Sequence, residues 1–499
     1  MLFMNKPYQT LIFLLAVAVL YLSISAIVPD DAFMVLGVKL RVPNPLGELI
    51  KNKPEPLANT IDSVMPAAYS EEQTFTDSTT VRTGSSVQGL ELVKNGGKVD
   101  SAYVKTARSV DVTYSIEIPG NGKPFFGFFN AIKSKSENEL IRVLHYGDSQ
   151  IEGDRITKEV RTVLQNEFGG QGFGLIPVWN AEYLPPGFRV HLTEQVKVSS
   201  LVKAIPSQKA QCVLGSITEV VPAESFREVI TFTVTSKVNF KNLQVISGGA
   251  DSSYAFKIIV DGIESDDKRV EHGTGVNLIS FSLPNQFRKI SILVKNPSPL
   301  KIYGFLAESG SGLSVSNIAL RGSSGNFFNQ FDPQVASEIF RLLNVRLVIL
   351  QFGINVVPSN LSSYAYYERL MDQQVRSIRR FAPQADVLVV GVSDMATRID
   401  GELCSYPSVE LVLRAQRRAA YQSGAAFWDG YHVMGGRGSI IDWVNATPPL
   451  ATKDYAHFTG YGAKRFGQKL ALAITSAINS LGKTSVDSNP VQIDSVSHE

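Results

Sequence analysis

The chain has 499 residues, of which 44% are hydrophobic and 19% are charged. This length accommodates two or three domains, and this composition excludes a disordered protein. The net charge is +2 without long runs of like charge, which gives no indication of a nucleic-acid partner. The two cysteines, Cys212 and Cys404, lack metal-ligand or C-x-x-C spacing. This disfavours a zinc site and leaves open whether the two thiols pair.

The N-terminal region contains an apolar segment at residues 11–28, LIFLLAVAVLYLSISAIV, with 18 residues and no charge. Its length is at the lower limit for crossing a bilayer. Lys6 precedes it and Asp30 follows it, which favours export of the rest of the chain. We expect residues 1–30 to be a retained anchor in the inner membrane, with a cleaved signal peptide as the alternative. Either way, the bulk of the chain is expected outside the cytoplasm, in the periplasm or cell envelope.

The pattern after residue 110 predicts an α/β domain. Residues 31–110 are rich in Pro, Ser and Thr and are predicted to be an extracytoplasmic tether. Short β-branched runs then alternate with amphipathic helical patterns, which indicates a parallel sheet with helices on both faces. The predicted strands are 142–147, 346–353 and 386–392, and the predicted helices are 125–137, 150–168, 363–381, 409–422 and 462–481.

A different pattern interrupts this domain at residues 186–308. Alternating runs such as EVITFTVTS, YAFKIIVDG and KISILVKN follow one another with short turns and without helices. They predict an antiparallel β-sandwich. The expected architecture is therefore a three-layer α/β/α domain in two parts, 111–185 and 309–483, around a β-sandwich insert. The tail at 484–499 is predicted to be disordered.

Ser149 is the first candidate for chemistry, in the segment RVLHYGDSQIEGD. It follows a buried strand at Gly147-Asp148, where an open α/β sheet exposes side chains at the carboxyl end of its strands. The segment differs from the nucleophile elbow G-x-S-x-G because position 151 is Ile. A helix N-cap is the alternative role for Ser149.

A nucleophilic serine needs a base, and the chain has six histidines. His457 in DYAHFTG directly precedes the last helical pattern, and Asp454 stands three residues before it, close enough to orient the imidazole. Helix capping and simple packing are the structural alternatives for this pair. His432, in DGYHVMGG, is the rival base. His145 lies within a predicted strand and should point away from the corner.

Two further loops offer donors for an oxyanion. Gly322, in LRGSSG, presents a backbone amide, and Asn355 ends the strand RLVILQFGIN. An asparagine in this position is by itself more typical of a turn. It gains weight here because four separate strand-end loops supply complementary groups.

At these residues the sequence resembles the SGNH (GDSL-type) hydrolase superfamily, whose four blocks match in order. They are Ser149 in GDSQ, Gly322 in LRGSSG, Asn355 in GIN, and Asp454 with His457 in DYAH. The resemblance implies a catalytic triad of Ser149, Asp454 and His457. It also implies an oxyanion hole formed by Ser149, Gly322 and Asn355, with no metal or organic cofactor.

One residue departs from the superfamily pattern, and three further segments indicate which group of the superfamily the chain resembles. Val356 stands where many members carry an Asp that is not catalytic. The segments FGGQGFGLIP, AFWDGYHVMGGRGS and DYAHFTGYG are similar to the peptidoglycan O-acetylesterase-like group. Some members of that group carry a carbohydrate-binding type of β-sandwich within the hydrolase domain, as predicted at 186–308. The resemblance covers residues 120–483.

The resemblance implies a serine-dependent O-acetylesterase whose partner is an acetylated glycan of the cell envelope, most of all O-acetylated peptidoglycan. An acetyltransferase with the same triad and a non-catalytic glycan-binding protein are the alternatives, and a lipase is disfavoured because no extended apolar lid is evident. For the insert, Tyr254 and its strand neighbours are candidates for sugar contacts. The alternative role of the insert, to which we give equal weight, is to form one wall of the active-site cleft.

Overall fold

The computed structural model of the chain separates into two units, residues 1–91 and 92–499. It describes residues 115–486 with gaps at 120–122, 177, 179–183, 185–186, 202–210, 212, 236–239 and 272–274. In the first unit it describes only β1 (Phe33–Val35) and β2 (Val38–Leu40), which pair antiparallel. The predicted anchor at 11–28, most of the predicted tether and Cys212 lie outside the described residues. No helix in the described part is long and apolar enough to cross a membrane.

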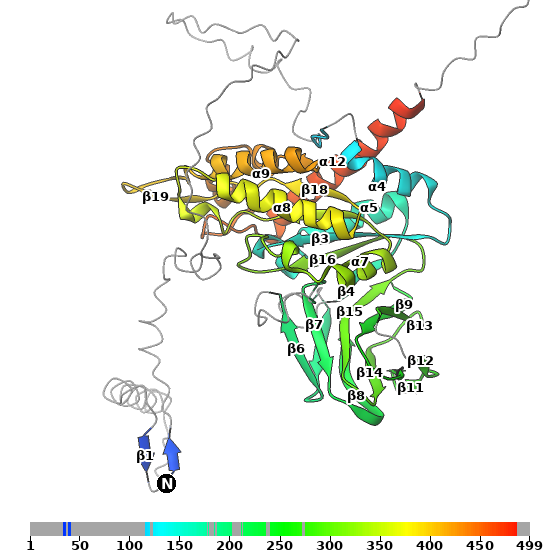
Figure 1. Cartoon of the computed structure of the whole chain (residues 1–499). Coiled ribbons are helices and arrows are strands. Elements are labelled where there is room, and N and C mark those ends of the chain that lie inside the picture. Colours follow the sequence, from blue (N-terminus) through cyan, green and yellow to red (C-terminus); the bar gives the residue numbers. More distant parts are fainter. Residues whose placement is uncertain are drawn as a thin grey trace, which may run out of the picture. The chain divides into compact units, whose positions relative to one another are not determined.

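A five-stranded parallel sheet, of which Figure 1 labels β3, β16 and β18, forms the centre of the second unit. Its strand order is β16-β3-β17-β18-β21. Its strands are nearly continuous apolar runs because both faces are buried. The structure confirms the predicted parallel sheet. The strands are β3 (Leu140–Gly147), β16 (Gly312–Ala319), β17 (Val345–Gln351), β18 (Asp386–Val390) and β21 (Ala426–Trp428).

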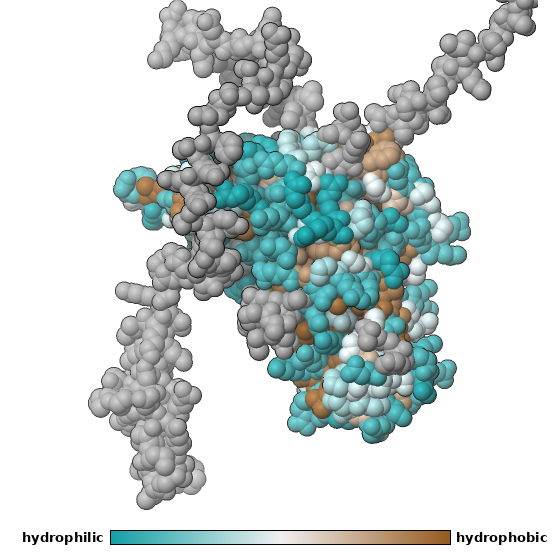
Figure 2. Space-filling model, viewed as in Figure 1, coloured by the Kyte–Doolittle hydropathy of each residue, from teal (hydrophilic) through white to brown (hydrophobic). Residues whose placement is uncertain are grey.

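Helices cover both faces of this sheet, as the three-layer prediction requires. Alternate strand residues enter opposite cores: Val143 and Ile349 belong to one cluster, whereas Leu144 and Leu350 belong to the other. The cluster of Leu144 receives α7 (Pro333–Leu342), α8 (Ala365–Phe381) and α9 (Val409–Ser423). The cluster of Val143 receives α4 (Lys123–Ser134), α5 (Thr157–Phe168), α10 (Gly430–Met434), α11 (Ser439–Asn445) and α12 (Gly460–Val486). Figure 2 shows a mainly hydrophilic surface over α8 and α9, as expected for amphipathic helices.

The insert is a β-sandwich of two antiparallel sheets with its own core, in which Phe232 packs edge-on against Phe305 at 5.3 Å. One sheet holds β5 (Phe188–Leu192), β8 (Ala223–Val234), β10 (Tyr254–Val260), β11 (Ile263–Glu264), β12 (Lys268–Val270) and β14 (Lys289–Asn296). The other holds β4 (Gly172–Ile176), β6 (Val196–Ser200), β7 (Ser216–Val220), β9 (Asn242–Gly248), β13 (Asn277–Ser282) and β15 (Leu300–Glu308). Because β4 precedes residue 186, this sheet begins earlier than the predicted insert. A hairpin of β19 (Ala396–Ile399) and β20 (Glu402–Ser405) completes the strands.

The segment after Ser149 differs from the predicted helix 150–168. A 3-10 segment, η3 (Ser149–Asp154), comes first, and α5 starts only at Thr157. Gly153 and Asp154 interrupt the helix with φ values of 64° and 62°, in the left-handed region. The buried Asp154 carboxylate is held by Arg161, whose Nη1 donates to it at 2.6 Å. Two further 3-10 segments are η5 (Phe328–Gln330) and η6 (Val357–Ser359).

A buried ion pair joins the α/β domain to the insert. Arg142 in β3 donates from Nε to Glu308 in β15 at 2.9 Å, and its Nη2 donates to the Gln244 side chain in β9, also at 2.9 Å. The side chain of Arg142 is 5% exposed and that of Glu308 is fully buried. A buried charge that loses its partner keeps the desolvation penalty without the compensating attraction.

We therefore expect Glu308→Gln to lower the free energy of unfolding by about 3–5 kcal/mol. The matched control is Asp372→Asn, which removes the partner of Arg376 in an exposed pair and should cost less than about 1 kcal/mol. Urea unfolding of both variants measures the difference. Equal losses in the two variants would contradict a special role for the buried pair.

Candidate active site

The Gly147-Asp148-Ser149 corner lies between the ends of two neighbouring strands. The Leu320 amide, after β16, donates to the Gly147 carbonyl at 2.7 Å, and the Asp148 amide donates to the carbonyl of Gln351 in β17 at 3.2 Å. A Cβ at position 147 would lie 2.9 Å from that same Gln351 oxygen. Glycine is therefore required here by the close approach of two backbones.

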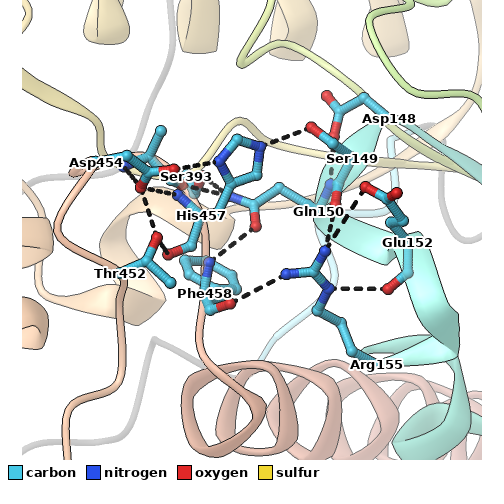
Figure 3. A network of polar contacts seen from close by, with 11 residues as sticks. Asp148, Ser149, Gln150, Glu152, Arg155, Ser393, Thr452, Asp454, His457 and Phe458 are labelled. Atoms are coloured by element: carbon cyan, nitrogen blue, oxygen red, sulfur yellow. Dashed lines mark hydrogen bonds and ion pairs between the residues drawn. The ribbon is translucent and has the colours of Figure 1, made fainter. Parts of the chain in front are cut away.

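Ser149 is not the residue that caps the following segment. The Asp148 carboxylate accepts from the Gln150 amide at 3.0 Å and so takes the capping role. The Ser149 hydroxyl instead lies 2.7 Å from His457 Nε2 (Figure 3). The N-cap of this segment is therefore Asp148, and the hydroxyl of the next residue contacts His457 instead. The N-cap alternative for Ser149 is wrong.

Asp454 orients the imidazole of His457 from the other side. Its Oδ2 lies 2.7 Å from His457 Nδ1, and its Oδ1 accepts from the backbone amides of Ala456 and His457 at 3.0 and 3.1 Å. Partial burial raises the pKa of the Asp454 carboxyl. Hydrogen bonds from His457, Thr452 and the two amides outweigh this effect and hold the pKa below its usual range. An ionised Asp454 favours the tautomer that carries its proton on Nδ1, which leaves Nε2 to accept from Ser149.

Gln150 fixes the loop that carries His457, a role that the sequence did not predict. Its Nε2 donates to the Ala456 carbonyl at 2.7 Å and to Ser393 Oγ at 3.2 Å, and its Oε1 accepts from the Phe458 amide at 3.3 Å. The residues before and after His457 are thus bonded to one buried side chain (Figure 3). The one feature of the sequence that could have indicated this role is that Gln150 directly follows Ser149.

The two predicted oxyanion donors lie on the loops that flank the corner. Gly322 follows β16 with φ 78°, and an added Cβ there would meet no atom within 4 Å. Asn355 follows β17, and its Nδ2 donates to the Ser323 carbonyl at 3.0 Å. Because β3 lies between β16 and β17, both loops reach the edge of the sheet where Ser149 stands. Their role as oxyanion donors stays a prediction.

The structure does not bring the rival base to Ser149. His432 Nδ1 lies 2.7 Å from Asp429, and the side chain of His432 is 60% exposed. His145, which was predicted to lie within a strand and to point away from the corner, is buried between Gln351 and Thr157. Burial lowers its pKa to about 3, so this imidazole is neutral and structural.

Tyr254 is not available as a sugar platform. Its side chain is buried at 2% exposure, and its hydroxyl contacts Ser247 at 3.1 Å and Asn277 at 3.3 Å within the insert. The prediction for this residue is wrong because alternation in a strand identifies two faces without showing which one is covered.

The overall fold of the chain is similar to that of a solved structure. A structure of a peptidoglycan O-acetylesterase is 21% identical, covers 72% of this chain and 96% of its own, and superposes with a TM-score of 0.57. The chain has the fold of the SGNH hydrolases. A family two carbohydrate esterase from Cellvibrio japonicus is 9% identical, covers 63% of this chain and 99% of its own, and has a TM-score of 0.26. No protein-family model and no curated protein matches the chain.

Within this fold, Asp148 is a buried carboxyl directly before Ser149. Burial raises its pKa to about 7, and the Gln150 amide and the nearby His457 counteract part of that effect. In the unfolded chain the carboxyl ionises near 3.8, whereas in the folded protein it keeps its proton until about 7. Between these values the folded state binds more protons, so Asp148 makes stability fall as the pH rises.

We expect Asp148→Asn, which cannot ionise, to gain stability relative to the wild type as the pH rises from about 4 to about 7, and to keep that gain above about 7. Urea unfolding of both proteins across this range measures the difference in the free energy of unfolding. A difference that stays constant at every pH would show that the Asp148 carboxyl titrates alike in the folded and unfolded states.

Proposed function

We propose that this protein is a serine-dependent esterase that removes acetyl groups from a cell-envelope polysaccharide, with O-acetylated peptidoglycan as the substrate. The hydrogen-bonded series Ser149–His457–Asp454, with 2.7 Å at each link, carries the proposal. The fold shared with a structure named as a peptidoglycan O-acetylesterase supports the substrate. The predicted export of the chain through residues 11–28 supports it as well.

In the proposed reaction, Ser149 Oγ attacks the ester carbonyl while His457 Nε2 takes its proton. The negative oxygen of the tetrahedral intermediate would be held by the amides of Ser149 and Gly322 and by the Asn355 side chain. As the bond between the acyl carbon and the sugar oxygen breaks, His457 gives the proton to that oxygen, so the sugar departs with a free hydroxyl and an acetyl ester remains on Ser149. Water, deprotonated by His457, hydrolyses this ester to acetate and restores the serine.

The solvent exposure of His457 and Asp454 favours water over a sugar as the acyl acceptor. The side chains of His457 and Asp454 are 33% and 50% exposed, so solvent reaches the base that activates the second step. A transferase must keep water away from its acyl-enzyme, whereas the imidazole that would activate water is here one-third exposed.

The two Asp-x-x-His pairs provide a matched test of the base. In each pair a carboxylate oxygen lies 2.7 Å from Nδ1 of the histidine, but only His457 contacts Ser149. We expect His457→Ala to lower kcat/KM for p-nitrophenyl acetate by at least about 10³-fold, because it disables the catalytic unit. His432→Ala should keep a value close to that of the wild type. Comparable losses in both variants would refute the assignment of His457 as the base.

The reaction itself is tested with O-acetylated peptidoglycan, with and without an added glycan acceptor. We expect free acetate to account for the acetyl groups lost under both conditions, and Ser149→Ala to release none. Acetate measured enzymatically and acetylated acceptor measured by mass spectrometry distinguish the outcomes. Accumulation of acetylated acceptor in place of acetate would show a transferase.

A further inference from the structure

The Arg155 side chain lies across the serine corner and the loop that carries His457 (Figure 3). Its Nη2 donates to the Ser149 carbonyl at 3.1 Å, and its Nη1 donates to the Phe458 carbonyl at 3.1 Å. Its Nε donates to the Glu152 carbonyl at 2.8 Å, and the three bonds together fix the plane of the guanidinium. One side chain therefore joins the residue of the proposed nucleophile to the residue that directly follows the proposed base.

A break in the helical path brings Arg155 back towards this corner. Glu152 leaves the helical conformation with ψ 144°, and Gly153 and Asp154 follow with φ values of 64° and 62°. A residue other than glycine keeps a left-handed backbone where its surroundings impose it. For Asp154 these surroundings include the buried Arg161, whose guanidinium donates to both carboxylate oxygens, at 2.6 and 2.9 Å. The turn is thus held in place, and Arg155 comes directly after it.

Arg155 and Gln150 hold the same point of the histidine loop. Gln150 is buried, and its Oε1 accepts from the Phe458 amide at 3.3 Å. Arg155 is 28% exposed, and it donates to the carbonyl of the same residue. Both backbone polar groups of Phe458 are therefore bonded to side chains from the serine segment. Of these two side chains, Arg155 is the one that also bonds to Ser149, so it ties the loop to the nucleophile residue itself.

We propose that Arg155 is a positioning residue, which holds the Ser149 hydroxyl and the His457 imidazole at the separation that proton transfer needs. The inference rests on the proposed function and adds to it a residue that acts through the backbone of two loops. A guanidinium suits this task because it donates in several directions from a rigid plane, whereas the ammonium of a lysine donates from a single point. A small displacement of the reacting groups lowers the rate of an enzyme by about 10²-fold.

The first test measures hydrolysis of p-nitrophenyl acetate by Arg155→Ala and by Arg155→Lys, which keeps the charge without the planar fork. We expect kcat to fall by about 10²-fold in both variants with little change in KM, because the two reacting groups are displaced. Added guanidinium should restore kcat in Arg155→Ala by at least about tenfold, the effect of one hydrogen bond from a charged donor. Sodium chloride at the same ionic strength should not restore it.

Arg437→Ala is the matched control, since Arg437 is 58% exposed and pairs with Glu410 at 3.2 Å on another part of the surface. It should keep the kcat of the wild type and should not respond to guanidinium. The lysine variant keeps the test available if Arg155→Ala does not fold. A wild-type kcat in either Arg155 variant would overturn the positioning role.

A second measurement needs no turnover, and it separates failure of this role from failure of the proposed function. Diethyl pyrocarbonate modifies accessible imidazoles, and His432 is an internal reference because its Nδ1 is bonded to Asp429 as that of His457 is bonded to Asp454. We expect modification of His457, mapped by mass spectrometry, to be faster in Arg155→Ala than in the wild type, and modification of His432 to be equal in both.

Faster modification of His457 alone supports the positioning role even in a protein that hydrolyses no ester. Unchanged modification of His457 in Arg155→Ala, with a wild type that hydrolyses p-nitrophenyl acetate, would leave the esterase intact and remove the role of Arg155.

Discussion

The hydrogen bond between Ser149 and His457 is the contact on which the rest of the site depends, and it joins residues 308 positions apart. It forms only if the loop after β3 and the loop before α12 keep a fixed separation. Gln150 supplies that constraint, because its side chain bonds to the backbone on both sides of His457. The serine and the residue that positions its base are therefore consecutive in sequence, and a single corner fixes both.

Ser149 and the Asp454–His457 pair differ in burial, and this difference fits the roles proposed for them. Ser149 is 6% exposed and its corner is bonded to both neighbouring strands, which gives the hydroxyl a single position. The Asp454 side chain is half exposed, and four hydrogen bonds rather than burial hold it ionised. A hydroxyl fixed on the rigid sheet thus meets an imidazole that solvent can reach, as the proposed reaction requires.

The insert is joined to the α/β domain through polar contacts as well as packing. Arg142 reaches from β3 to Glu308 in β15, and β15 leads almost directly into β16, which pairs with β3. Gly174 in β4 makes close packing possible at this junction, since a Cβ there would lie 2.4 Å from Ser316 Oγ in β16. The sandwich is therefore continuous with the sheet edge that carries the loop of Gly322.

Local sequence patterns were sufficient to predict a parallel sheet with three of its five strands, the β-sandwich and the segments that carry Ser149, Asp454 and His457, but not the strands β16 and β21. Period-two and helical alternation reports on burial, and Gly-Asp-Ser after a strand indicates an abrupt corner. Each of these patterns lies within a short segment, so it can be recognised without knowing which distant residues the segment contacts. The 3-10 segment after Ser149 was not predicted, because the left-handed residues Gly153 and Asp154 break a helix that the apolar pattern continues.

What only the tertiary structure decided concerns pairs of residues far apart in the chain. The contact of Ser149 with His457 and not with His432 depends on which loop meets the corner, since each histidine has its own Asp three residues before it. Tyr254 is covered because a second sheet packs on its face, and Gln150 acquires its role from a loop about 300 residues away. The sequence determined which residues have the chemistry for the site, and long-range packing determined which of them meet, because contact between distant segments leaves no periodic signal in either one.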